Sequence, residues 1–490
     1  MDGYQRKTSP PTTRRERGLV KNDGCTTAFE FSLLDSVKDI NTLEEACLTI
    51  ACKLFVGLIE RLDDALLEHK PKHYTCVGKR PRTLSTRIGD IVINRRLYVK
   101  TTKKSRNGRF LLDEALNIRP RRRVTHGLLR LLVSASTRMS FREVEEMLAE
   151  AGFSRISHTT IHEEVRFYGL LQRQAMERSR NMLFAAGQDV HDGEEVKRPP
   201  ILFIEADGIM VGHQGDQKKL EIKLGVVHEG WEEVGNRRRL IDPIIVAGLF
   251  EGGDEFWETL TAQLAKIYDL TDTLIVINGD GAAWIQSTAP EYFANAIVQL
   301  DRYHLFRDLR LAVGPKAAKR LLAHLNEGEV KVFRDTLESL EPVIPEKKLP
   351  IYKKLLSLCK KYPDHLPDYR QRLGDEYKGI ALFGMGAAET MVDKKIANRM
   401  KKRGMSWSRD GAAAMAALQM LRSNGQLFSW LDRHPENDVQ NPVPQLQRHV
   451  LTEGKGDLGD WLKVTMPALC GSTRPWVKAL RGLSGFACAL

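Results

Sequence analysis

Three acidic residues, far apart in the sequence, stand where carboxylates could hold metal ions. Asp207 ends the apolar run ILFIEA and Asp280 ends the apolar run TLIVING, each followed by a glycine, and Glu389 opens the helical pattern ETMVDKKIANRM. The three carboxylates can meet only if the two strands are neighbours in one sheet. They would then form an oxygen cage suited to Mg²⁺ or Mn²⁺. Such a cage can hold two ions about 3.5–4 Å apart and catalyse in-line phosphodiester displacement.

Each acid also has a structural explanation. Asp-Gly after a strand is common turn chemistry, and an acid in the first turn of a helix complements the helix dipole. Asp393 lies one helical turn after Glu389 and is the reserve candidate for the third position. Glu205 shares a strand face with Asp207, and Asp301 follows a later strand. Both acids could contact the metal-binding residues without binding the ions themselves.

The elements that must position these acids alternate between strands and helices. Strands are predicted at 201–212, 218–231, 238–252, 273–279 and 296–300. An amphipathic helix at 254–268 and a short helix after residue 280 separate the later strands. The order β-β-β-α-β-α-β predicts an α/β fold with a mixed sheet, the order found in ribonuclease H-like folds. We expect a helical insertion before the third acid and a helical region upstream of the sheet.

The upstream region is rich in positive charge. A helix at about 40–68 precedes two alternating strands over 82–100, with Gly89-Asp90 as the turn signal. Residues 95–123 hold eleven Lys and Arg against two acids, which suits contact with a phosphate backbone. A solvated basic hairpin and linker is the alternative. The residues assigned to DNA contact here are Arg95, Arg96, Lys103, Lys104, Arg121, Arg122 and Arg123.

Residues 126–170 return to a helical pattern. Ser140 and Glu143 form a capping box that opens one helix, and the helix ends near Gly152. Ser157 then begins another helix. This order is typical of a helix-turn-helix, although an ordinary helical hairpin fits this stretch nearly as well. As a DNA reader, the second helix would present Arg155, His158, Thr159 and Thr160.

Four local motifs point to a family. They are IEADG (204–208), NGDGAAWI (278–285), LDRYHLFRDL (300–309) and GMGAAETMVDKKIANRMKKRGMSWSRDG (384–411). Together they resemble the DDE transposases of bacterial insertion sequences, most closely the ISLre type, which is similar to the Mutator-like group. The resemblance implies a ribonuclease H-like catalytic domain with Asp207, Asp280 and Glu389 as the triad for two Mg²⁺ or Mn²⁺ ions. His304 is expected to position the substrate or to stabilise the fold.

The resemblance further implies a DNA transposase that binds terminal inverted repeats and cleaves and joins DNA. Its partner would be double-stranded DNA, on which the chain would form a homodimer or a larger assembly. Trp407 could stack on an unpaired base while Arg399 and Lys402 hold phosphates; core packing of the Trp is the alternative. Two other functions remain open, namely an inactive transposase-derived DNA-binding protein and a metal-dependent DNA nuclease.

The composition is that of a soluble globular protein. The 490 residues carry a formal charge of +12 and are 42% hydrophobic, and no apolar run approaches the ~20 residues of a membrane-spanning helix. Seven Cys without a CxxC pair predict reduced thiols and no zinc finger. We therefore expect a cytoplasmic protein, and the resemblance to bacterial transposases implies a bacterial, nucleoid-associated one. Its predicted segments are a flexible basic tail (1–28), a basic DNA-binding region (29–125), a helix-turn-helix (126–180), the catalytic domain (196–303 and 379–430), a helical insertion (304–378) and a C-terminal extension (431–490).

Overall fold

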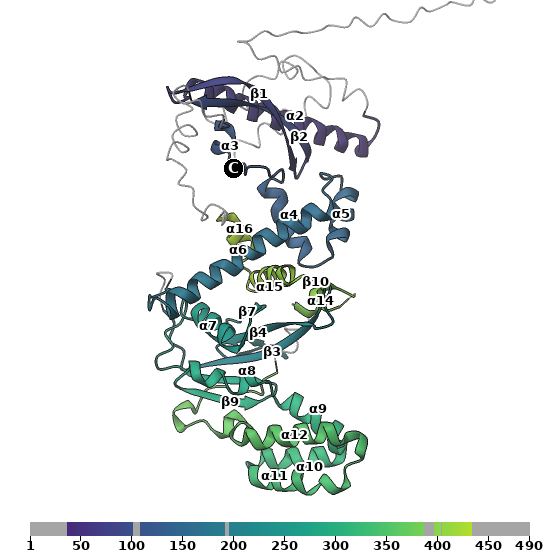
Figure 1. Ribbon diagram of the computed structural model, residues 1–490, viewed down its shortest axis with the longest axis vertical. Coiled ribbons are helices and arrows are strands. Elements are labelled where there is room, and N and C mark those ends of the chain that lie inside the picture. The colour runs from purple at the N-terminus through teal and green to yellow at the C-terminus, as the bar shows by residue number, and fades with distance from the viewer. Residues whose placement is uncertain (1–36, 101–107, 192–195, 387–395, 403, 434–490) are drawn as a thin grey trace, which may run out of the picture. The chain divides into compact units, whose positions relative to one another are not determined.

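A computed structural model describes residues 37–100, 108–191, 196–386, 396–402 and 404–433. These residues fall into two compact units (Figure 1). Unit 1 contains the described residues up to Thr125 together with Gly152–Ser154, and unit 2 contains His126–Ala151 and the described residues from Arg155 onward. Within the described residues, no helix combines the length and the apolar character needed to cross a membrane.

Unit 1 is a helix packed on a two-stranded ribbon. Its elements are α2 (Ile40–Glu68), β1 (Tyr74–Thr86), β2 (Gly89–Lys100) and α3 (Leu111–Ala115). Asp39 caps α2 by accepting a hydrogen bond from the backbone N–H of Thr42 at 2.8 Å. The core of this unit joins all four elements through Ile59, Leu66, Leu84, Ile91, Ile93 and Leu112. The predicted helix over 40–68 is present with those bounds.

The ribbon differs from the predicted hairpin in its start and its turn. β1 begins at Tyr74, eight residues before the predicted strand, because its first half is polar and exposed and gives no alternating signal. Thr86 pairs with Gly89, so the turn residues are 87–88 and not Gly89-Asp90. The Thr86 hydroxyl fixes this turn by accepting a hydrogen bond from the N–H of Ile88 at 3.1 Å and donating one to the carbonyl of Gly89 at 2.7 Å.

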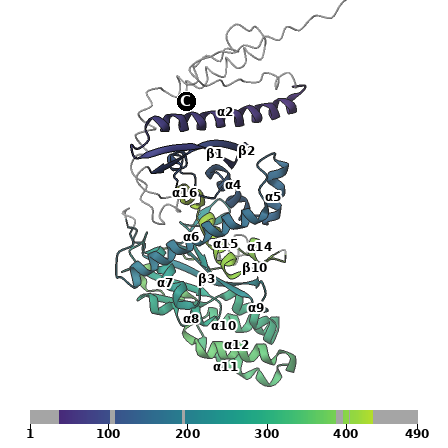
Figure 2. The ribbon, with the colours of Figure 1, turned by 45° about the horizontal axis from the view of Figure 1, so that its top comes forward.

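Unit 2 begins with three helices. They are α4 (His126–Ser136), α5 (Phe141–Glu150) and α6 (His158–Phe184). The predicted capping box of Ser140 and Glu143 is present at the start of α5, and Ser157 caps α6. α6 is much longer than a recognition helix requires, and α15 (Arg409–Ser423) packs along it (Figure 2). The buried residues of α6 run from Ile161 to Met176, so the first two thirds of this helix belong to the core of unit 2.

A mixed sheet forms the centre of unit 2. Its strands are β3 (Ile201–His213), β4 (Leu220–His228), β7 (Ile244–Gly248), β8 (Leu274–Gly279) and β9 (Ala296–Leu300). They lie in the order β7-β4-β3-β8-β9, with β4 antiparallel to β3 and β7, and with β8 parallel to β3 and β9. The short β10 (Ser406–Trp407) pairs with the far end of β3. The predicted mixed α/β fold is confirmed at this level.

The predicted strand over 238–252 is in fact two elements. Its first residues form β6 (Arg237–Leu240), which pairs with β5 (Trp231–Val234) in a separate hairpin. Its middle residues form β7, and residues 249–252 belong to no strand. The chain breaks between β6 and β7 at Asp242, whose φ is 44°, and at Pro243, which lacks the N–H that a ladder needs.

Helices cover the sheet. α7 (Gly253–Leu264) packs so closely on β4 that a Cβ at Gly225 would lie 2.6 Å from Leu260. The opposite face holds Phe203 and Val276 in a cluster with Tyr369 and part of the chain that follows it. α15 is buried on every side from Gly411 to Leu421, as expected for a helix between other elements. Shorter helices of this unit are α8 (Ala283–Gln286), α14 (Asn398–Met400) and α16 (Leu427–Asp432).

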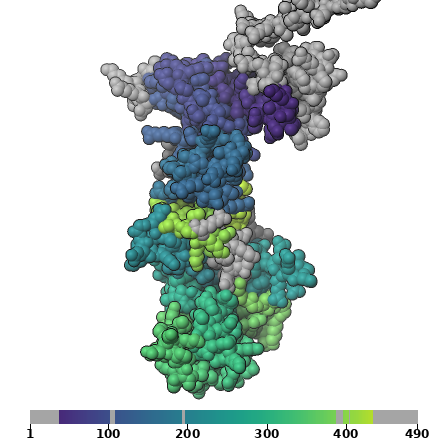
Figure 3. All heavy atoms as spheres, turned by 90° about the vertical axis from the view of Figure 1, so that its right-hand side faces the viewer, coloured from purple at the N-terminus to yellow at the C-terminus, as the bar shows by residue number. Residues whose placement is uncertain are grey.

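The residues after β9 form the predicted helical segment. Its helices are α9 (Arg302–Val313), α10 (Pro315–Asn326), α11 (Val330–Ser339) and α12 (Leu349–Lys361). One 3₁₀ turn precedes β9, at Ala289–Tyr292, and others follow at Glu341–Val343, Glu346–Lys348, Pro363–His365, Tyr369–Gln371 and Asp375–Tyr377. The segment has a core of its own, which runs from Leu300 to Leu366 and includes Phe333 and Tyr352. Its surface is the green lower part of Figure 3.

Candidate metal-binding site

The register of two parallel strands places Asp207 beside Asp280. The parallel pairing of β3 with β8 ends with Ala206 opposite Gly279. Asp207 and Asp280 are the next residues on the two strands, and neighbouring strands lie about 4.8 Å apart. The two strands are therefore neighbours, as expected. The convergence of the two acids depended on this.

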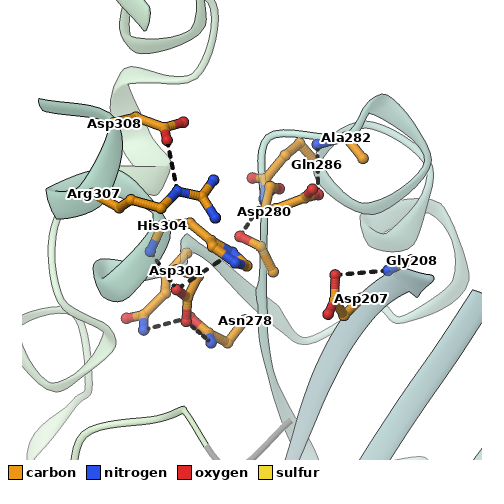
Figure 4. A network of polar contacts seen from close by, with 12 residues as sticks. Asp207, Gly208, Asn278, Asp280, Ala282, Gln286, Asp301, His304, Arg307 and Asp308 are labelled. Atoms are coloured by element: carbon orange, nitrogen blue, oxygen red, sulfur yellow. Dashed lines mark hydrogen bonds and ion pairs between the residues drawn. The ribbon is translucent and has the colours of Figure 1, made fainter. Parts of the chain in front are cut away.

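β9 adds a third acid to the same row. The pairing of β8 with β9 ends with Gly279 opposite Leu300, and Asp301 is the next residue. Its backbone N–H donates to the carbonyl of Gly279 at 2.8 Å. Asp207, Asp280 and Asp301 thus occupy equivalent positions on three adjacent strands (Figure 4). We call these three residues the acid row.

The acid row opens into a hollow of about 230 Å³. The hollow is lined by Glu205, Ala206, Asp207, Asn278, Gly279, Asp280, Asp301, Tyr303, His304 and Gly386. Four of these residues carry carboxyl groups, and neither Lys nor Arg is among the described residues that line the hollow. The hollow is therefore an acidic site in a chain whose overall charge is +12.

Glycines on both sides of Asp280 let other elements approach it. A Cβ at Gly279 would lie 2.7 Å from the side chain of Ile285 in α8, and one at Gly281 would lie 2.6 Å from Leu358 in α12. The motif Gly-Asp-Gly thus has a packing reason. It allows a helix of the sheet region and a helix of the inserted segment to pack against the loop that carries the acid.

Backbone groups hold the first two acids at the row. One oxygen of Asp207 accepts a hydrogen bond from the N–H of Gly208 at 2.7 Å, and one oxygen of Asp280 accepts from the N–H of Ala282 at 2.9 Å. Within the described part of the chain, the second oxygen of each carboxylate has no hydrogen-bond partner. Burial raises the pKa of Asp207, and the charges of Asp280 and Asp301 raise it further.

Asp301 is held by a buried polar network. It accepts hydrogen bonds from the Asn278 side chain at 2.8 Å and from the backbone N–H of His304 at 2.8 Å. Asn278 in turn accepts from the Gln299 side chain, whose oxygen accepts from the N–H of Tyr369 at 2.8 Å. The network fixes Asp301 between the sheet and the helical segment.

His304 faces the hollow from the first turn of α9. Its Nδ1 lies 3.6 Å from Asp301 Oδ1 and has no hydrogen-bond partner among the described residues. The side chain is 22% exposed. His304 therefore has a ring nitrogen at the edge of the acid row, and its role in positioning a substrate or stabilising the fold stays a prediction.

Glu205 lies beneath the row and is fully buried. Its carboxylate is 3.6 Å from Nε2 of His228, which is also fully buried. The His228 ring stacks on Phe203 at a centroid distance of 5.2 Å. Glu205 lines the hollow from the position two residues before Asp207, in agreement with the shared strand face that the sequence indicates.

The third predicted acid, Glu389, lies outside the described residues, as do Asp393, Lys103 and Lys104. The described chain reaches the hollow at Gly386, three residues before Glu389. Among the described residues, one group of possible metal ligands has its ligand atoms within 4.8 Å of one another. It consists of His324, Glu327 and Glu329, near the start of α11. The acid row is therefore more open than a closed metal cage.

The predicted DNA contacts in unit 1 divide into two groups. Arg95 forms an ion pair with Asp113 at 2.5 Å and packs on the Phe110 ring, and Arg96 pairs with Asp63 at 2.9 Å. These two arginines hold the ribbon to its helices. The three arginines at 121–123 lie at the surface, fully or partly exposed. DNA contact by this second group remains a prediction.

The predicted contacts in unit 2 also differ in exposure. Arg155 and Thr159 are exposed at the start of α6, Thr160 is partly exposed, and His158 binds Glu145 through Nδ1 at 2.6 Å. Trp407 is buried and donates from Nε1 to the carbonyl of Met400 at 2.9 Å. Arg399 is buried, donates to the carbonyl of Ser136 at 2.8 Å and packs on the Trp407 ring. This placement favours the core-packing alternative for Trp407, whereas Lys402 is exposed.

The chain matches a family model over most of its length. The model, described as an uncharacterised protein family (UPF0236), covers residues 33–433. The chain belongs to this family. A UPF0236 protein in the vanSb 3′ region of Streptococcus gallolyticus is 26% identical over 460 residues, which cover 90% of this chain and 96% of the relative.

Other UPF0236 relatives come from Caldanaerobacter subterraneus subsp. tengcongensis. One is 26% identical over 382 residues, covering 75% of this chain and 74% of the relative, and its name combines eleven locus designations. Of the solved structures, a chain of the Drosophila P element transposase strand transfer complex is similar with 11% identity and a TM-score of 0.23, covering 71% of this chain and 88% of that chain. A TM-score this low carries no argument.

Sequence reasoning missed several residues of this UPF0236 site. Asn278 and Gln299 are polar residues inside the apolar strands TLIVING and AIVQL, and both are 2% exposed. A buried polar side chain must be hydrogen-bonded, so their positions could have indicated a network. Tyr303 lines the hollow beside His304, and its exposure could not be read from the sequence.

Proposed function

We propose that this UPF0236 chain is a DNA transposase of the DDE type, with a ribonuclease H-like catalytic domain centred on the acid row. The observation that carries the proposal is the register of β3, β8 and β9, which aligns three carboxylates at one edge of the sheet. The strand order and the antiparallel β4 support a ribonuclease H-like sheet. The four sequence motifs that resemble ISLre-type transposases include all three acids of the row.

The charge of the hollow indicates how it would be used. Like charges a few ångströms apart repel strongly in a partly buried site, and a phosphate group would add to that repulsion. Divalent cations remove this conflict, because they neutralise the carboxylates and attract the phosphate oxygens. An acidic hollow in a basic chain therefore fits a metal-dependent reaction on a polyanion.

The donor set fits Mg²⁺ or Mn²⁺. Asp207 and Asp280 each offer a carboxylate oxygen without a partner among the described residues, and hard oxygen donors are the ligands that these ions prefer. We assign Asp207, Asp280 and Glu389 as the residues that would hold two ions. Three residues span at most about 11 Å of extended chain, so Glu389 is within chain reach of the hollow that Gly386 lines. When bound, the ions would supply an activated water or 3′-hydroxyl and stabilise the leaving oxygen.

The chain's own residues would prepare this reaction. The N–H groups of Gly208 and Ala282 hold one oxygen of Asp207 and Asp280, which leaves the other free to face the hollow. Asp301, held by Asn278, orients His304 at the edge of the row. His304 would position a phosphate oxygen or a hydroxyl by hydrogen bonding.

The names of the relatives give independent support. One Caldanaerobacter relative carries eleven locus designations in one strain, and another carries four. A protein encoded at many loci of one genome is what an element that copies itself would leave. By analogy, the partners of this chain would be transposon ends and target DNA, bound by a dimer or a larger assembly.

The proposal is tested by three substitutions in the full chain. Asp207→Asn, Asp280→Asn and Glu389→Gln should each reduce Mg²⁺-dependent cleavage of a plasmid that carries the DNA flanking the reading frame by at least about 100-fold. Binding of the same DNA should change little. Glu346→Gln, at an exposed acid of the helical segment, is the matched control. Normal cleavage by the Asp207 and Asp280 variants would refute the proposal.

Two other functions are distinguished by the same assay. A metal-dependent nuclease would release ends without joining them to a second DNA molecule. An inactive DNA-binding protein would bind the flanking DNA and leave the plasmid intact at every metal concentration. The intact acid row favours the transposase over the inactive protein.

A further inference from the structure

The helix that begins beside the acid row carries an exposed stripe. α9 starts directly after Asp301. Its exposed residues are Tyr303, Arg307, Arg310 and Leu311. Their spacing of four, three and one places them on one side of a helix. The opposite side, with Leu305, Leu309 and Ala312, is buried in the core of the helical segment. The stripe thus runs along the helix from the hollow toward solvent.

Tyr303 begins the stripe at the hollow itself. It lines the hollow, yet 55% of its surface is exposed. Its ring meets the ring of His304 edge-on, at a centroid distance of 5.7 Å. Large aromatic rings are usually buried, and an exposed ring at a site mouth offers a face for another planar group. Nucleic acid bases are such groups, and they stack on tyrosine regardless of sequence.

Two guanidinium groups follow Tyr303 along the helix. At 1.5 Å per residue, Arg307 and Arg310 lie about 6 Å and 10 Å farther along the helix axis than Tyr303. Arg307 is about half exposed and pairs with the adjacent Asp308 at 3.0 Å, and Arg310 lies 5.7 Å from the Phe306 ring. Arginines at this spacing can hold successive phosphates of one strand.

The segment that carries the stripe has a strong positive charge. Residues 302–372 contain 16 Lys and Arg against nine Asp and Glu, a formal charge of +7. The hollow, in contrast, is acidic. A strand that enters the hollow would therefore be held at its flank by this segment, while its phosphate at the acid row would depend on divalent cations.

We infer that Tyr303 stacks on the base next to the scissile phosphate and that Arg307 and Arg310 hold the phosphates of the nucleotides that follow. This inference rests on the proposed function and deepens it. A tyrosine ring can stack only on a base whose face is free. The substrate is therefore a DNA strand that is unpaired for at least one nucleotide at the point of cleavage.

The stacking is tested with a fluorescent base in the full chain carrying Asp207→Asn, which should bind DNA without cutting it. The probe is a duplex made from the DNA flanking the reading frame, with a short unpaired flank that contains 2-aminopurine at one position at a time. Binding should quench the fluorescence at one position, because the base stacks on Tyr303. Adding Tyr303→Ala should remove that quenching and weaken binding by about 10-fold, whereas Tyr303→Phe should preserve both.

The phosphate contacts are tested through salt dependence. Arg307→Ala and Arg310→Ala should each reduce the slope of the logarithm of affinity against the logarithm of salt concentration by about 1. Lys331→Ala is the matched control, because Lys331 is exposed on α11 and its substitution removes one positive charge from the same segment. An equal reduction by the control would show a general charge effect and refute the assignment of the two arginines.

The failure of this inference can be told apart from failure of the proposed function. If the wild-type chain cuts DNA and quenching does not depend on Tyr303, the stacking is wrong and the proposed function stands. If quenching depends on Tyr303 but the wild-type chain never cuts DNA with Mg²⁺, the stacking stands and the catalytic proposal falls. Absence of any binding to the probe overturns both. Loss of quenching in Tyr303→Phe would show that the ring is not the stacking group.

Discussion

At the residue scale, Asp207 is a carboxylate in a place that disfavours its charge. It is half-buried, and Asp280 and Asp301 are its neighbours in the acid row. Burial and these two charges together raise the pKa of Asp207. Burial also raises the pKa of Asp63 and Asp113, but each of these carboxylates forms an ion pair with an arginine. A partly buried carboxylate beside two like charges, with no such pair among the described residues, is typical of a functional site.

This shift makes a prediction about stability. The pKa of Asp207 is higher in the folded chain than in the unfolded chain, so protonation of this carboxyl stabilises the fold. The contribution to the free energy of unfolding is fully present below the unfolded-state pKa of about 3.9. That stability is lost as the pH rises through the folded-state pKa. In metal-free buffer at neutral pH, Asp207→Asn should therefore raise the Tm, and the gain should vanish below about pH 4.

Thermal unfolding across this pH range measures the effect. Asp272→Asn, at an exposed acid of unit 2, should leave the Tm unchanged at every pH. Addition of Mn²⁺ should raise the Tm of the wild-type chain by mass action and have a much smaller effect on Asp207→Asn. A lower Tm for Asp207→Asn at neutral pH would mean that the Asp207 charge stabilises the fold.

The predicted functional residues differ in how well their roles could be inferred from the sequence. Asp207 and Asp280 could be predicted, because each follows an apolar run that must be buried and the parallel pairing of β3 with β8 places them side by side. Arg95 and Arg96 could not be separated from DNA contacts, because their partners, Asp113 and Asp63, are distant in sequence. Only the structure shows that both arginines are paired with carboxylates of the same unit.

At the element scale, the fold depends on the contact between α6 and α15. A Cβ at Gly169 would lie 2.6 Å from backbone atoms of Ala414, so the two helices touch through their backbones. A backbone cannot move aside as a flexible side chain can. This glycine therefore sets how closely the two helices approach each other, and α15 in turn packs on β7 and β4.

Gly169→Ala should destabilise unit 2 by at least about 2 kcal/mol, because the added methyl group must push α15 away from α6. Urea unfolding followed by circular dichroism measures this change. Gly384→Ala is the matched control, since a Cβ there meets nothing within 4 Å and the residue has no positive φ, and it should cost only a few tenths of a kcal/mol. Equal stability of the Gly169 variant and the wild type would contradict the close packing of the two helices.

Element types were easier to predict than element limits. The strand over 296–300 and the helix over 40–68 agree with the structure because continuous apolar patterns define them. The start of β1 was missed because its exposed first half has no such pattern, and the strand over 238–252 was divided because Asp242 and Pro243 interrupt it. The second helix of the predicted helix-turn-helix, or of the alternative helical hairpin, continues to Phe184 as α6, and its buried residues belong to the core of unit 2. DNA contact at its start stays a prediction.

At the scale of the whole molecule, the chain combines a net charge of +12 with an acidic hollow. The two features belong to one function if the basic surfaces hold DNA and the hollow acts on a single phosphate. Affinity for DNA should then come mostly from phosphate contacts. If the full chain makes at least six of them, binding should weaken by about 1,000-fold between 50 and 200 mM salt.

Fluorescence anisotropy with a labelled duplex measures this dependence. At one fixed Mg²⁺ concentration, Asp207→Asn and the wild-type chain should have the same salt slope, because the basic surfaces lie outside the acid row. A slope near zero would show that the positive charge of the chain serves solubility and not DNA binding.

The central claim is that Asp207 and Asp280 hold a divalent cation at the edge of the sheet. Anomalous diffraction from crystals of the full chain grown with Mn²⁺ tests it most directly. The account predicts a manganese peak about 2.0–2.6 Å from carboxylate oxygens of both residues. A peak only at His324, Glu327 and Glu329, or no peak beside the acid row at saturating Mn²⁺, would contradict it.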